Sequence, residues 1–520
     1  MKRAISILWF LTISLTLTQG AHAASGTLKK FYSKRFNMGL KGVPLAKIGI
    51  YTGISSVRIT APTGLTVKSG NGAGLTASGA SSFVVTKGRT TPAKVRYWIS
   101  MKSVPSTDRK AYLKAYKEMQ RLGIKTTPKE QGFIIALRGK VLDTRRILFS
   151  VGPFPTYQGA KKRLVKLAKN RHGVFVHSEL VHLPAGTMSA QSGRFTLSVV
   201  SVLTFATATG KPVTVTSGGI SRAYPGIIHV VVGRDGNLAV VNELDMETYL
   251  AGILPSELFP SAPLEALKAQ AVAARGQVLA KMGTRHHGDP FHLCAKVHCQ
   301  VYDGLHKVYK RTTAAVLKTK GEVLFDGRGL PADTVYHSSS GGHGENNENV
   351  WGGEPKPYLR GRPDGVRWSY TDEASLSRFL LTPQTGAFCR QGNRRFRWSI
   401  PFTQKRMRSL LKKGHMRGTL RSLKPLRRGV SGRILELEVR TSKERRILRG
   451  ELTIRRFFGG LYSSMFLIKK SGKGYTFTGG GFGHGVGMSQ WGAINRAKKG
   501  QRYRQILNHY YKGTKLLRMY

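Results

Sequence analysis

An alanine-rich stretch near the middle of the chain places the strongest constraint on the fold. Between Lys268 and Lys281 the only charged residue is Arg275, and apolar residues recur at positions 264, 267, 271, 274 and 278. That spacing is typical of one helix face, and the small alanine side chains between them let neighbouring elements come close. The stretch therefore predicts a buried helix that starts near Pro263. A lone arginine inside such a helix needs an acidic partner or a ligand.

The residues before this helix hold one carboxyl group in apolar surroundings. Asp245 is a candidate N-cap for a first helix that would run to Leu254, where Pro255 would end it. Glu257 would then lie in a bend beside the buried helix. Desolvation there would raise the pKa of its carboxyl group, as a general acid requires. The alternative interpretation is a surface glutamate and a structural arginine.

Five longer motifs occupy the second half of the chain. They are AQAVAAR at 269–275, CQVYDG at 299–304, YHSSSGGHGENNENVWGG at 336–353, GFGHGVGMSQWGA at 481–493 and ILNHYYKGTKL at 506–516. In sequence and order they resemble the SpoIID/LytB family, that is, stage II sporulation protein D and its relatives, which are peptidoglycan lytic transglycosylases and amidase enhancers. Several ordered motifs over roughly the last 280 residues are far more specific than one glycine-rich loop.

The resemblance implies an exported lytic transglycosylase that cleaves glycan strands, expected to be peptide-free, between N-acetylmuramic acid and N-acetylglucosamine. Glu257 would be the general acid and base. One carboxyl group suffices because the 6-hydroxyl of the muramic acid attacks C1, whereas ordinary glycosidases use two carboxyl groups. Asp333 and Glu345 are candidate helpers. The alternative is a wall-binding amidase enhancer without its own chemistry, and a third class, an exported nucleic-acid binder, explains the charge but none of the motifs.

The resemblance also implies a substrate groove. We expect Arg275 at the floor of this groove rather than in a tight pair with Glu257, because a contacting cation would lower the pKa of the acid. The residues expected to contact glycan are Arg275, Gln300, Tyr302, Ser338, Ser339, Ser340, Gly341, Gly342, Gly483, His484, Gly485 and Gln490.

Residues 286–299 concentrate four histidines and two of the three cysteines of the chain. Sulfur and imidazole nitrogen are the ligands that zinc takes in tetrahedral sites. Some relatives hold zinc here with one histidine and two cysteines, so the resemblance implies a structural zinc on Cys294 and Cys299, with His287 and His292 as rival histidine ligands. In an exported protein a disulfide between Cys294 and Cys299 is the alternative.

The charge and the N-terminus bear on the cellular location. Lys and Arg outnumber Asp and Glu by 85 to 26, a formal net charge of +59, which favours a polyanionic partner. Lys2 and Arg3 precede an apolar run, and Ala21-His22-Ala23 resembles a signal-peptide cleavage site. Cleavage after Ala23 would leave the protein in the periplasm or outside the cell. The expected partners are therefore peptidoglycan, anionic envelope polymers and a cell-wall amidase, rather than nucleic acid. An uncleaved membrane anchor is the alternative.

The composition and patterns predict an α+β protein in four parts. After the signal peptide at 1–23, short strands separated by Gly, Ser and Thr fill residues 24–94, and they are expected to pair with strands of 194–242. Residues 95–187 have the order βαββαβ and resemble a degenerate SPOR domain, a glycan-binding module. Any ferredoxin-like βαββαβ insert is the alternative there, because fold does not fix the ligand. The SpoIID-like catalytic domain would span 188–520.

Overall fold

The computed structural model describes residues 21–33, 37–39, 42–137, 140–168, 173–472 and 474–520. The apolar run of the predicted signal peptide falls in residues 1–20, outside the described residues. The predicted cleavage site coincides with the first turn of helix α1 (Ala21–Tyr32). In the described part of the chain, no helix is long and apolar enough to cross a membrane.

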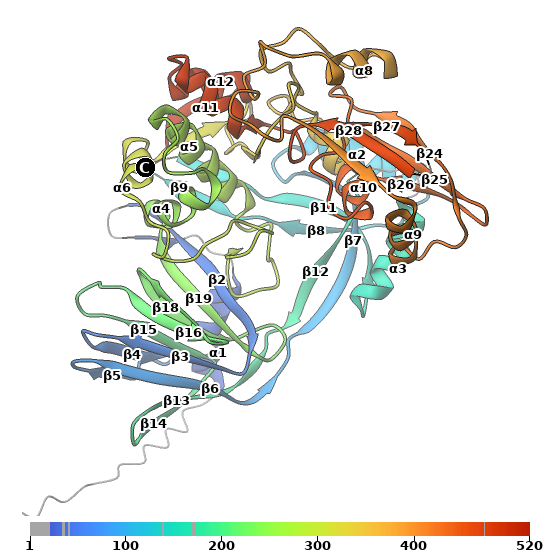
Figure 1. Cartoon of the computed structure of the whole chain (residues 1–520). Coiled ribbons are helices and arrows are strands. Elements are labelled where there is room, and N and C mark those ends of the chain that lie inside the picture. The colour runs from blue at the N-terminus through green and yellow to red at the C-terminus, as the bar shows by residue number, and fades with distance from the viewer. Residues whose placement is uncertain (1–20, 34–36, 40–41, 138–139, 169–172, 473) are drawn as a thin grey trace, which may run out of the picture.

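Two mainly antiparallel sheets form the lower half of the molecule in Figure 1 and share one hydrophobic core. Phe83 from one sheet and Phe205 from the other meet inside it, with ring centroids 5.9 Å apart. The first sheet contains, in spatial order, β1 (Asn37–Met38), β2 (Pro44–Ile54), β19 (Leu238–Asp245), β18 (Ile227–Val232), β15 (Val202–Ala206), β4 (Leu65–Ser69) and β5 (Gly74–Ala77), with β20 (Leu293–Cys294) beside β2. The second contains β14 (Phe195–Val200), β13 (Ala185–Ser192), β6 (Ser81–Thr91), β3 (Ser56–Ala61), β16 (Val213–Ser217) and β17 (Ile220–Tyr224).

The predicted pairing of the N-terminal strands with the later ones is confirmed. β2 pairs with β19, β4 with β15 and β3 with β16, all antiparallel. β6 likewise pairs with β13, so the residues between these two strands form an insertion in one sheet. The mixture of such sheets with a separate group of helices confirms the α+β class.

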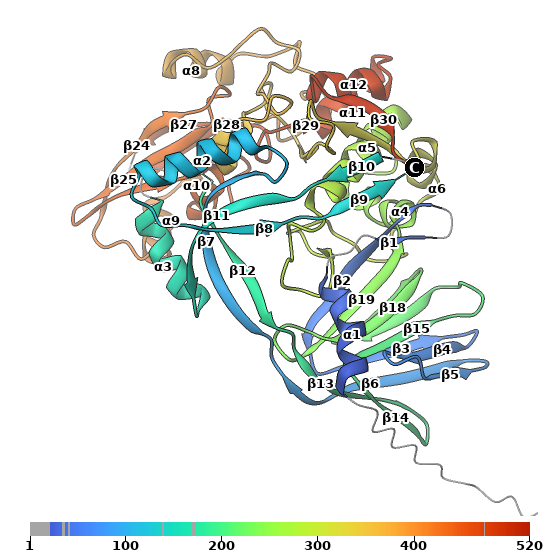
Figure 2. The same cartoon turned by 180° about the vertical axis from the view of Figure 1, so that it is seen from behind.

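The insertion is a module with the predicted βαββαβ order. Its elements are β7 (Lys94–Pro105), α2 (Arg109–Arg121), β8 (Thr127–Gln131), β11 (Arg146–Phe154), α3 (Tyr157–Leu167) and β12 (Phe175–His182). The four strands lie in the order β12-β7-β11-β8, all antiparallel, which is the ferredoxin-like arrangement. Figure 2 shows β7 and β12 leading from the lower sheets into this module.

A hairpin projects from the module between β8 and β11. We call residues 132–144 the hairpin arm; it contains β9 (Ile134–Leu137) and β10 (Lys140–Asp143). Phe133 and Leu142 of the arm belong to the same hydrophobic core as the lower sheets and the central helices. The module is therefore packed onto the rest of the molecule through a second contact, besides its two connecting strands.

Four helices surround α5 (Leu264–Lys281) above the sheets: α4 (Met246–Glu257), α6 (Lys310–Lys318), α11 (Gln490–Lys498) and α12 (Tyr503–Tyr510). The residues of α5 from Ala269 to Leu279 are all buried, which confirms the predicted buried helix. The prediction that α4 ends at Leu254 was wrong. The helix continues through Pro255 to Glu257, because the amide of Leu258 still donates to the Leu254 carbonyl at 2.9 Å and only the proline's own bond is missing.

Short elements join the C-terminal region to these helices. β21 (Glu322–Phe325) pairs with β30 (Lys515–Arg518), and β22 (Tyr336–His337) pairs with β29 (Met488–Ser489). Residues 373–480 add a unit with its own hydrophobic cluster, shown in orange and red in Figure 1. Its elements are α8 (Glu373–Leu381), β23 (Arg397–Phe402), α9 (Gln404–Lys413), β24 (Leu420–Arg428), β25 (Ile434–Thr441), β26 (Arg445–Arg449), α10 (Glu451–Phe457), β27 (Phe466–Ser471) and β28 (Gly474–Gly480).

Candidate functional site

A cavity of about 650 Å³ opens where α4 and α5 end. Segments far apart in the chain form its walls: the ends of both helices, β22, the short helix α7 (Asn347–Trp351) and the glycine-rich turn before β29. The side chains that bear on its chemistry are Glu257, Lys281, Asp333, Tyr336, Trp351 and His484. The cavity thus gathers the acid predicted from sequence and residues of three of the motifs.

Glu257 is the last residue of α4 and lines this cavity. Burial raises the pKa of its carboxyl group above the usual value, and the hydrogen bond with Tyr336 and the charge of Lys281 offset only part of that rise. The Glu257 backbone carbonyl accepts a hydrogen bond of 2.7 Å from Nε2 of Gln490, which fixes the end of the helix. The arrangement therefore provides a fixed, partly desolvated carboxyl group facing a cavity, as a general acid needs.

A chain of hydrogen bonds through buried polar side chains orients Tyr336. The Gln300 side-chain amide donates to the Tyr336 hydroxyl at 3.3 Å, and its oxygen accepts from the Tyr249 hydroxyl at 3.2 Å. Because the Tyr336 oxygen accepts this bond, its own proton is free to point toward Glu257. Gln300 is 3% exposed and acts through Tyr336, so the expected glycan contact of Gln300 was wrong. The expected glycan contact of Tyr302 was also wrong. Tyr302 is buried, and its hydroxyl donates a hydrogen bond of 2.9 Å to Oδ1 of Asn242.

Arg275 lies away from the cavity, in a buried ion pair. Its guanidinium donates to both carboxylate oxygens of Glu247, at 3.0 and 2.6 Å, and to the Glu322 carbonyl at 3.0 Å. The Tyr520 hydroxyl donates to the same carboxylate at 2.7 Å. The side chain of Arg275 is 0% exposed, so the expected role at the floor of the groove was wrong. The acidic partner that the lone arginine required is Glu247, in the first turn of α4.

The serine and glycine loop at 338–342 packs inside the protein and does not form a wall of the groove. Ser339, Ser340, Gly341 and Gly342 are buried, and Ser338 is half-buried, outside the set that lines the cavity. The expected glycan contacts of the four buried residues are therefore corrected, and that of Ser338 stays a prediction. A close approach explains the glycines, since a Cβ on Gly341 would lie 2.8 Å from the backbone of residue 480.

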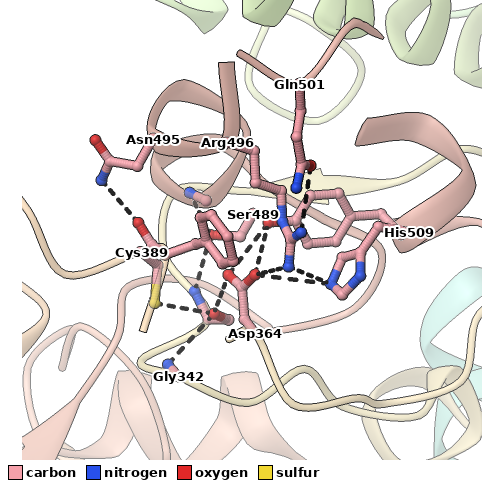
Figure 3. Close-up of polar contacts among 12 residues, drawn as sticks. Gly342, Asp364, Cys389, Ser489, Asn495, Arg496, Gln501 and His509 are labelled. Atoms are coloured by element: carbon pink, nitrogen blue, oxygen red, sulfur yellow. Dashed lines mark hydrogen bonds and ion pairs between the residues drawn. The ribbon is translucent and has the colours of Figure 1, made fainter. Parts of the chain in front are cut away.

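Figure 3 shows the polar network that holds this loop around Asp364. The Asp364 carboxylate accepts from the Ser340 hydroxyl at 3.2 Å and from Arg496 at 2.9 Å. The Tyr510 hydroxyl donates to it at 3.0 Å. The serine loop, which was predicted to face the substrate, is thus joined to the C-terminal helices α11 and α12 through one buried carboxylate.

The glycine-rich turn contributes His484 to the cavity. Its ring lies against Trp351, with centroids 4.9 Å apart, and burial together with the charge of Arg433 lowers the pKa of His484 to about 3. A neutral imidazole and an indole therefore form one wall. Gly485 instead abuts Arg433, where a Cβ would lie 2.4 Å from the guanidinium carbon, and Gly483 abuts His337. Gly485 is buried there, so its expected substrate contact is corrected. Gly483 and Gln490 are half-buried outside the cavity lining, and their substrate contacts stay predictions.

The two candidate helpers differ in position. Asp333 lines the cavity and pairs with Lys356 at 3.2 Å; burial alone would raise its pKa, but Lys356 and Lys281 lower it below the usual value. Glu345 is fully buried and accepts hydrogen bonds from Ser431 at 2.5 Å and Asn349 at 2.8 Å. Asp333 is thus an ionised neighbour, and Glu345 is a structural group.

Lys281, Tyr336 and Trp351 belong to the cavity but were missed as site residues. Tyr336 is the first residue of the motif at 336–353, and Trp351 is the third from its end. The sequence prediction for this motif rested on its serines and glycines instead. Lys281 is the first charged residue after the apolar part of α5, which signals a helix end near the bend of Glu257. That signal was available in the sequence.

A cluster of four ligand-type side chains borders the cavity. His286, Cys294, His298 and Cys299 each offer one atom, and these atoms lie within 4.8 Å of one another. Cys299 Sγ is 3.4 Å from His286 Nε2 and 3.5 Å from His298 Nδ1. Such separations fit four ligands about 2.0 to 2.3 Å from a single tetrahedral zinc ion. Asp289 lies 2.9 Å from Nδ1 of His286, as an outer carboxylate that orients a metal-binding imidazole does.

The cluster confirms the two cysteines as neighbours and corrects the two histidines. His287 and His292 are not part of it, and Nδ1 of His292 accepts a hydrogen bond from the Lys47 amide at 3.2 Å. His286 and His298 take their places. Cys294, Cys299 and Cys389 are free thiols in the structure, so the alternative disulfide is not formed there.

Comparison with known proteins finds two family models and several relatives. The model described as stage II sporulation protein matches residues 234–325, and a domain of unknown function (DUF8618) matches residues 345–487. An uncharacterised protein of Brachyspira hyodysenteriae is 31% identical over 282 residues, which cover 54% of this chain and 68% of that protein. Stage II sporulation protein D of Bacillus amyloliquefaciens is 29% identical over 302 residues, 55% of this chain and 78% of that protein.

The amidase enhancer of Bacillus subtilis is 29% identical over 306 residues, which cover 51% of this chain but 40% of that longer protein. The first family match contains Glu257, Lys281 and the four-residue cluster, and the second contains Trp351 and His484. The cavity therefore lies where the two matched segments meet.

Proposed function

The chain belongs to the SpoIID/LytB family, and from this membership, which supports a role at the cell wall, we propose that it is a lytic transglycosylase acting on peptidoglycan glycan strands. The observation that carries the proposal is the Glu257 carboxyl group, fixed at a helix end, partly desolvated and facing the cavity. The indole of Trp351, which also lines the cavity and is 51% exposed, offers the apolar surface on which sugar rings pack.

The reaction needs one group that first donates and then accepts a proton. Glu257 would donate its proton to the glycosidic oxygen as the bond from that oxygen to C1 of N-acetylmuramic acid breaks. The 6-hydroxyl oxygen of the same sugar forms a new bond to C1, and its proton passes to the Glu257 carboxylate. The products are a 1,6-anhydro-muramyl end and a free 4-hydroxyl on N-acetylglucosamine, no water is consumed, and the acid is restored. Tyr336 would hold the carboxyl group in place through its hydrogen bond.

Glu257→Gln tests this assignment, because the amide keeps the shape but cannot transfer the proton. We expect release of anhydro-muramyl products, measured by mass spectrometry of digested peptide-free glycan, to fall by at least about a hundredfold. Glu265→Gln, on the neighbouring helix and outside the cavity, is the matched control and should keep the wild-type rate. Wild-type release by Glu257→Gln would place the acid elsewhere.

The second candidate is a wall-binding amidase enhancer, which the similarity to the Bacillus subtilis protein of that name favours. It would bind glycan and stimulate a cell-wall amidase without cleaving strands itself. Wild-type protein that releases no anhydro-muramyl ends from peptide-free strands, yet accelerates an added amidase, would establish this function in place of the first.

We propose a structural zinc ion on His286, Cys294, His298 and Cys299. Two imidazole nitrogens and two thiolates form a closed tetrahedral set, and the hydrogen bond of Asp289 to His286 supports the ring orientation that zinc requires. When bound, the ion would cross-link the loop that ends α5 to the segment carrying Cys299, which lines the cavity. It would thus stabilise one wall without entering the transfer reaction.

We further propose that the protein is exported to the cell envelope and that the βαββαβ module contacts glycan. The apolar N-terminal run and the net charge of +59 support export to anionic surroundings. The ferredoxin-like strand order of the module is compatible with a SPOR-like module, and its ligand remains a proposal that binding of peptide-free glycan would test.

A further inference from the structure

Lys281 is a cavity-facing cation that the reaction does not use. It is the last residue of α5 and half-buried, and it shares the cavity with Glu257. Throughout the described residues, no carboxylate oxygen lies within the 4.0 Å of an ion pair from its ammonium. Burial lowers the pKa of Lys281 to about 8, which reflects how little the surroundings compensate its charge.

The other cations of the cavity are already engaged. The Lys356 ammonium pairs with Asp333 at 3.2 Å, and the Arg285 guanidinium donates to the backbone carbonyl of His298. The acids that face Lys281 are Asp333, which is bonded to Lys356, and Glu257, which must be protonated to act. A desolvated ammonium without a close partner is costly unless a ligand supplies an anion.

Glycan chemistry narrows the identity of that anion. N-acetylglucosamine is neutral. N-acetylmuramic acid carries a lactyl group on O3, whose carboxyl group is an amide when a stem peptide is attached and a free carboxylate when the peptide has been removed. A peptide-free strand therefore presents one negative charge on every muramic acid, and this is the sugar whose C1 must lie at Glu257.

We propose that Lys281 binds the free lactyl carboxylate of the N-acetylmuramic acid held beside Glu257, and so selects peptide-free glycan. This inference rests on the proposed function, since it assumes that a muramyl residue occupies the cavity. A strand with its peptide attached offers a neutral amide at this point and leaves Lys281 without an ionic partner. The carboxylate gains a charge-assisted hydrogen bond in a partly desolvated site, where such bonds are strongest.

Binding can be measured without turnover in the Glu257→Gln background. Three ligands are compared by calorimetry: a peptide-free tetrasaccharide of alternating N-acetylglucosamine and N-acetylmuramic acid, the same compound with each lactyl carboxyl converted to its methylamide, and tetra-N-acetylchitotetraose. We expect the free acid to bind about tenfold or more tightly than the methylamide, the value of one charged hydrogen bond. Lys281→Met should bring that ratio close to one.

Two variants sharpen this experiment. Lys281→Arg keeps the positive charge and should retain most of the preference. Lys268→Met removes a lysine from the same helix, outside the cavity and paired with Glu265 at 2.6 Å, and should leave the ratio unchanged. Thermal unfolding of each variant verifies that it is folded.

A ratio near one before Lys281 is changed, an undiminished ratio in Lys281→Met, or no binding of the free acid would each overturn the proposal. The failure of the proposed function is a different result. Wild-type protein that releases no anhydro-muramyl ends but still prefers the free acid through Lys281 would refute transglycosylase activity and leave the selection of peptide-free glycan intact.

Discussion

At Glu257 the raised pKa determines the pH range over which the acid form is present. An exposed glutamate has a pKa near 4.5, and burial keeps Glu257 protonated to higher pH. The rate should therefore fall as pH rises through the folded-state value, on the alkaline side of 4.5. Lys281 lowers this pKa, so Lys281→Met should move the alkaline limb of kcat/KM to higher pH.

Lys281→Arg is the control for that pH prediction, because it keeps the charge and should leave the limb in place. The profile is best recorded on methylamide strands as well as on free-acid strands, so that loss of lactyl binding is separated from the shift in pKa. A limb that moves to lower pH in Lys281→Met would contradict the electrostatic link between these two side chains.

The buried pair of Arg275 and Glu247 should contribute to stability rather than to catalysis. Arg275→Met would leave the Glu247 carboxylate buried and unpaired, with Tyr520 and the amide of Gly321 as its remaining partners. We expect the free energy of unfolding to fall by about 3 to 5 kcal/mol, measured by denaturant titration. The double variant Arg275→Met, Glu247→Leu should recover much of this loss. An intact stability but abolished glycan binding in Arg275→Met would restore the groove role.

The environment of a residue could be predicted from the sequence where only one kind of environment suits that residue type. A lone arginine among alanines had to be paired, and Glu257 beside that helix had to be partly desolvated. The partner of Arg275 could not be chosen, because Glu243, Glu247 and Glu257 all precede the helix and their distances depend on how α4 folds back on α5. The buried serines of 338–340 were misjudged for a similar reason: hydroxyl groups serve ligands and buried carboxylates such as Asp364 equally well.

At the scale of elements, the loop that carries His286, Cys294, His298 and Cys299 shows what the spacing of residues leaves open. His286 and His287 are adjacent, and φ of His286 is +50°, a left-handed conformation that turns its ring toward Cys299. The sequence pattern does not predict this left-handed conformation at His286. The prediction of a cysteine pair with histidines was therefore sound in its residue types, while the choice of histidines required the backbone.

The revised ligand set makes a metal prediction that separates neighbouring residues. Purified protein should hold one zinc ion, and His286→Ala or Cys294→Ser with Cys299→Ser should lose it, whereas His287→Ala should retain it. Metal content by mass spectrometry is the measurement. A chelator should also lower the midpoint of thermal unfolding in the wild type but not in the double cysteine variant. Zinc lost in His287→Ala and kept in His286→Ala would support the original assignment instead.

Across the whole molecule, the excess of basic residues should govern encounter with the wall. The formal net charge is +59, and surface interactions at this charge are screened over about 10 Å at 0.1 M salt. We expect retention on isolated wall glycan to weaken steeply between low and high salt. Neutral chitin is the comparison surface, on which salt should matter far less. Equal retention on wall glycan at both salt concentrations would remove the electrostatic contribution.

The hairpin arm determines whether the inserted module behaves as a separate domain. The βαββαβ order was predictable from alternating patterns, but the contact made by the arm was not, because Phe133 meets Gly283, 150 positions later in the chain. Phe133 packs directly on Gly283, where a Cβ would lie 2.0 Å from the ring. Gly283 lies two residues after Lys281 and three before His286, so the arm packs against the segment that joins the cavity to the cluster of His286, Cys294, His298 and Cys299.

This placement predicts one unfolding unit that includes the module and the central helices. Phe133 and Leu142 are 7% and 8% exposed in the shared core, so Phe133→Ala should cost about 3 to 5 kcal/mol and separate the calorimetric transition of the module from that of the rest. Val141→Ala, on the same hairpin but 68% exposed, should change neither the number nor the position of the transitions. If Phe133→Ala also leaves them unchanged, the arm carries no coupling and the module is an independent domain. If the transitions separate and zinc affinity falls as well, the arm holds the segment between Lys281 and His286 in its working position.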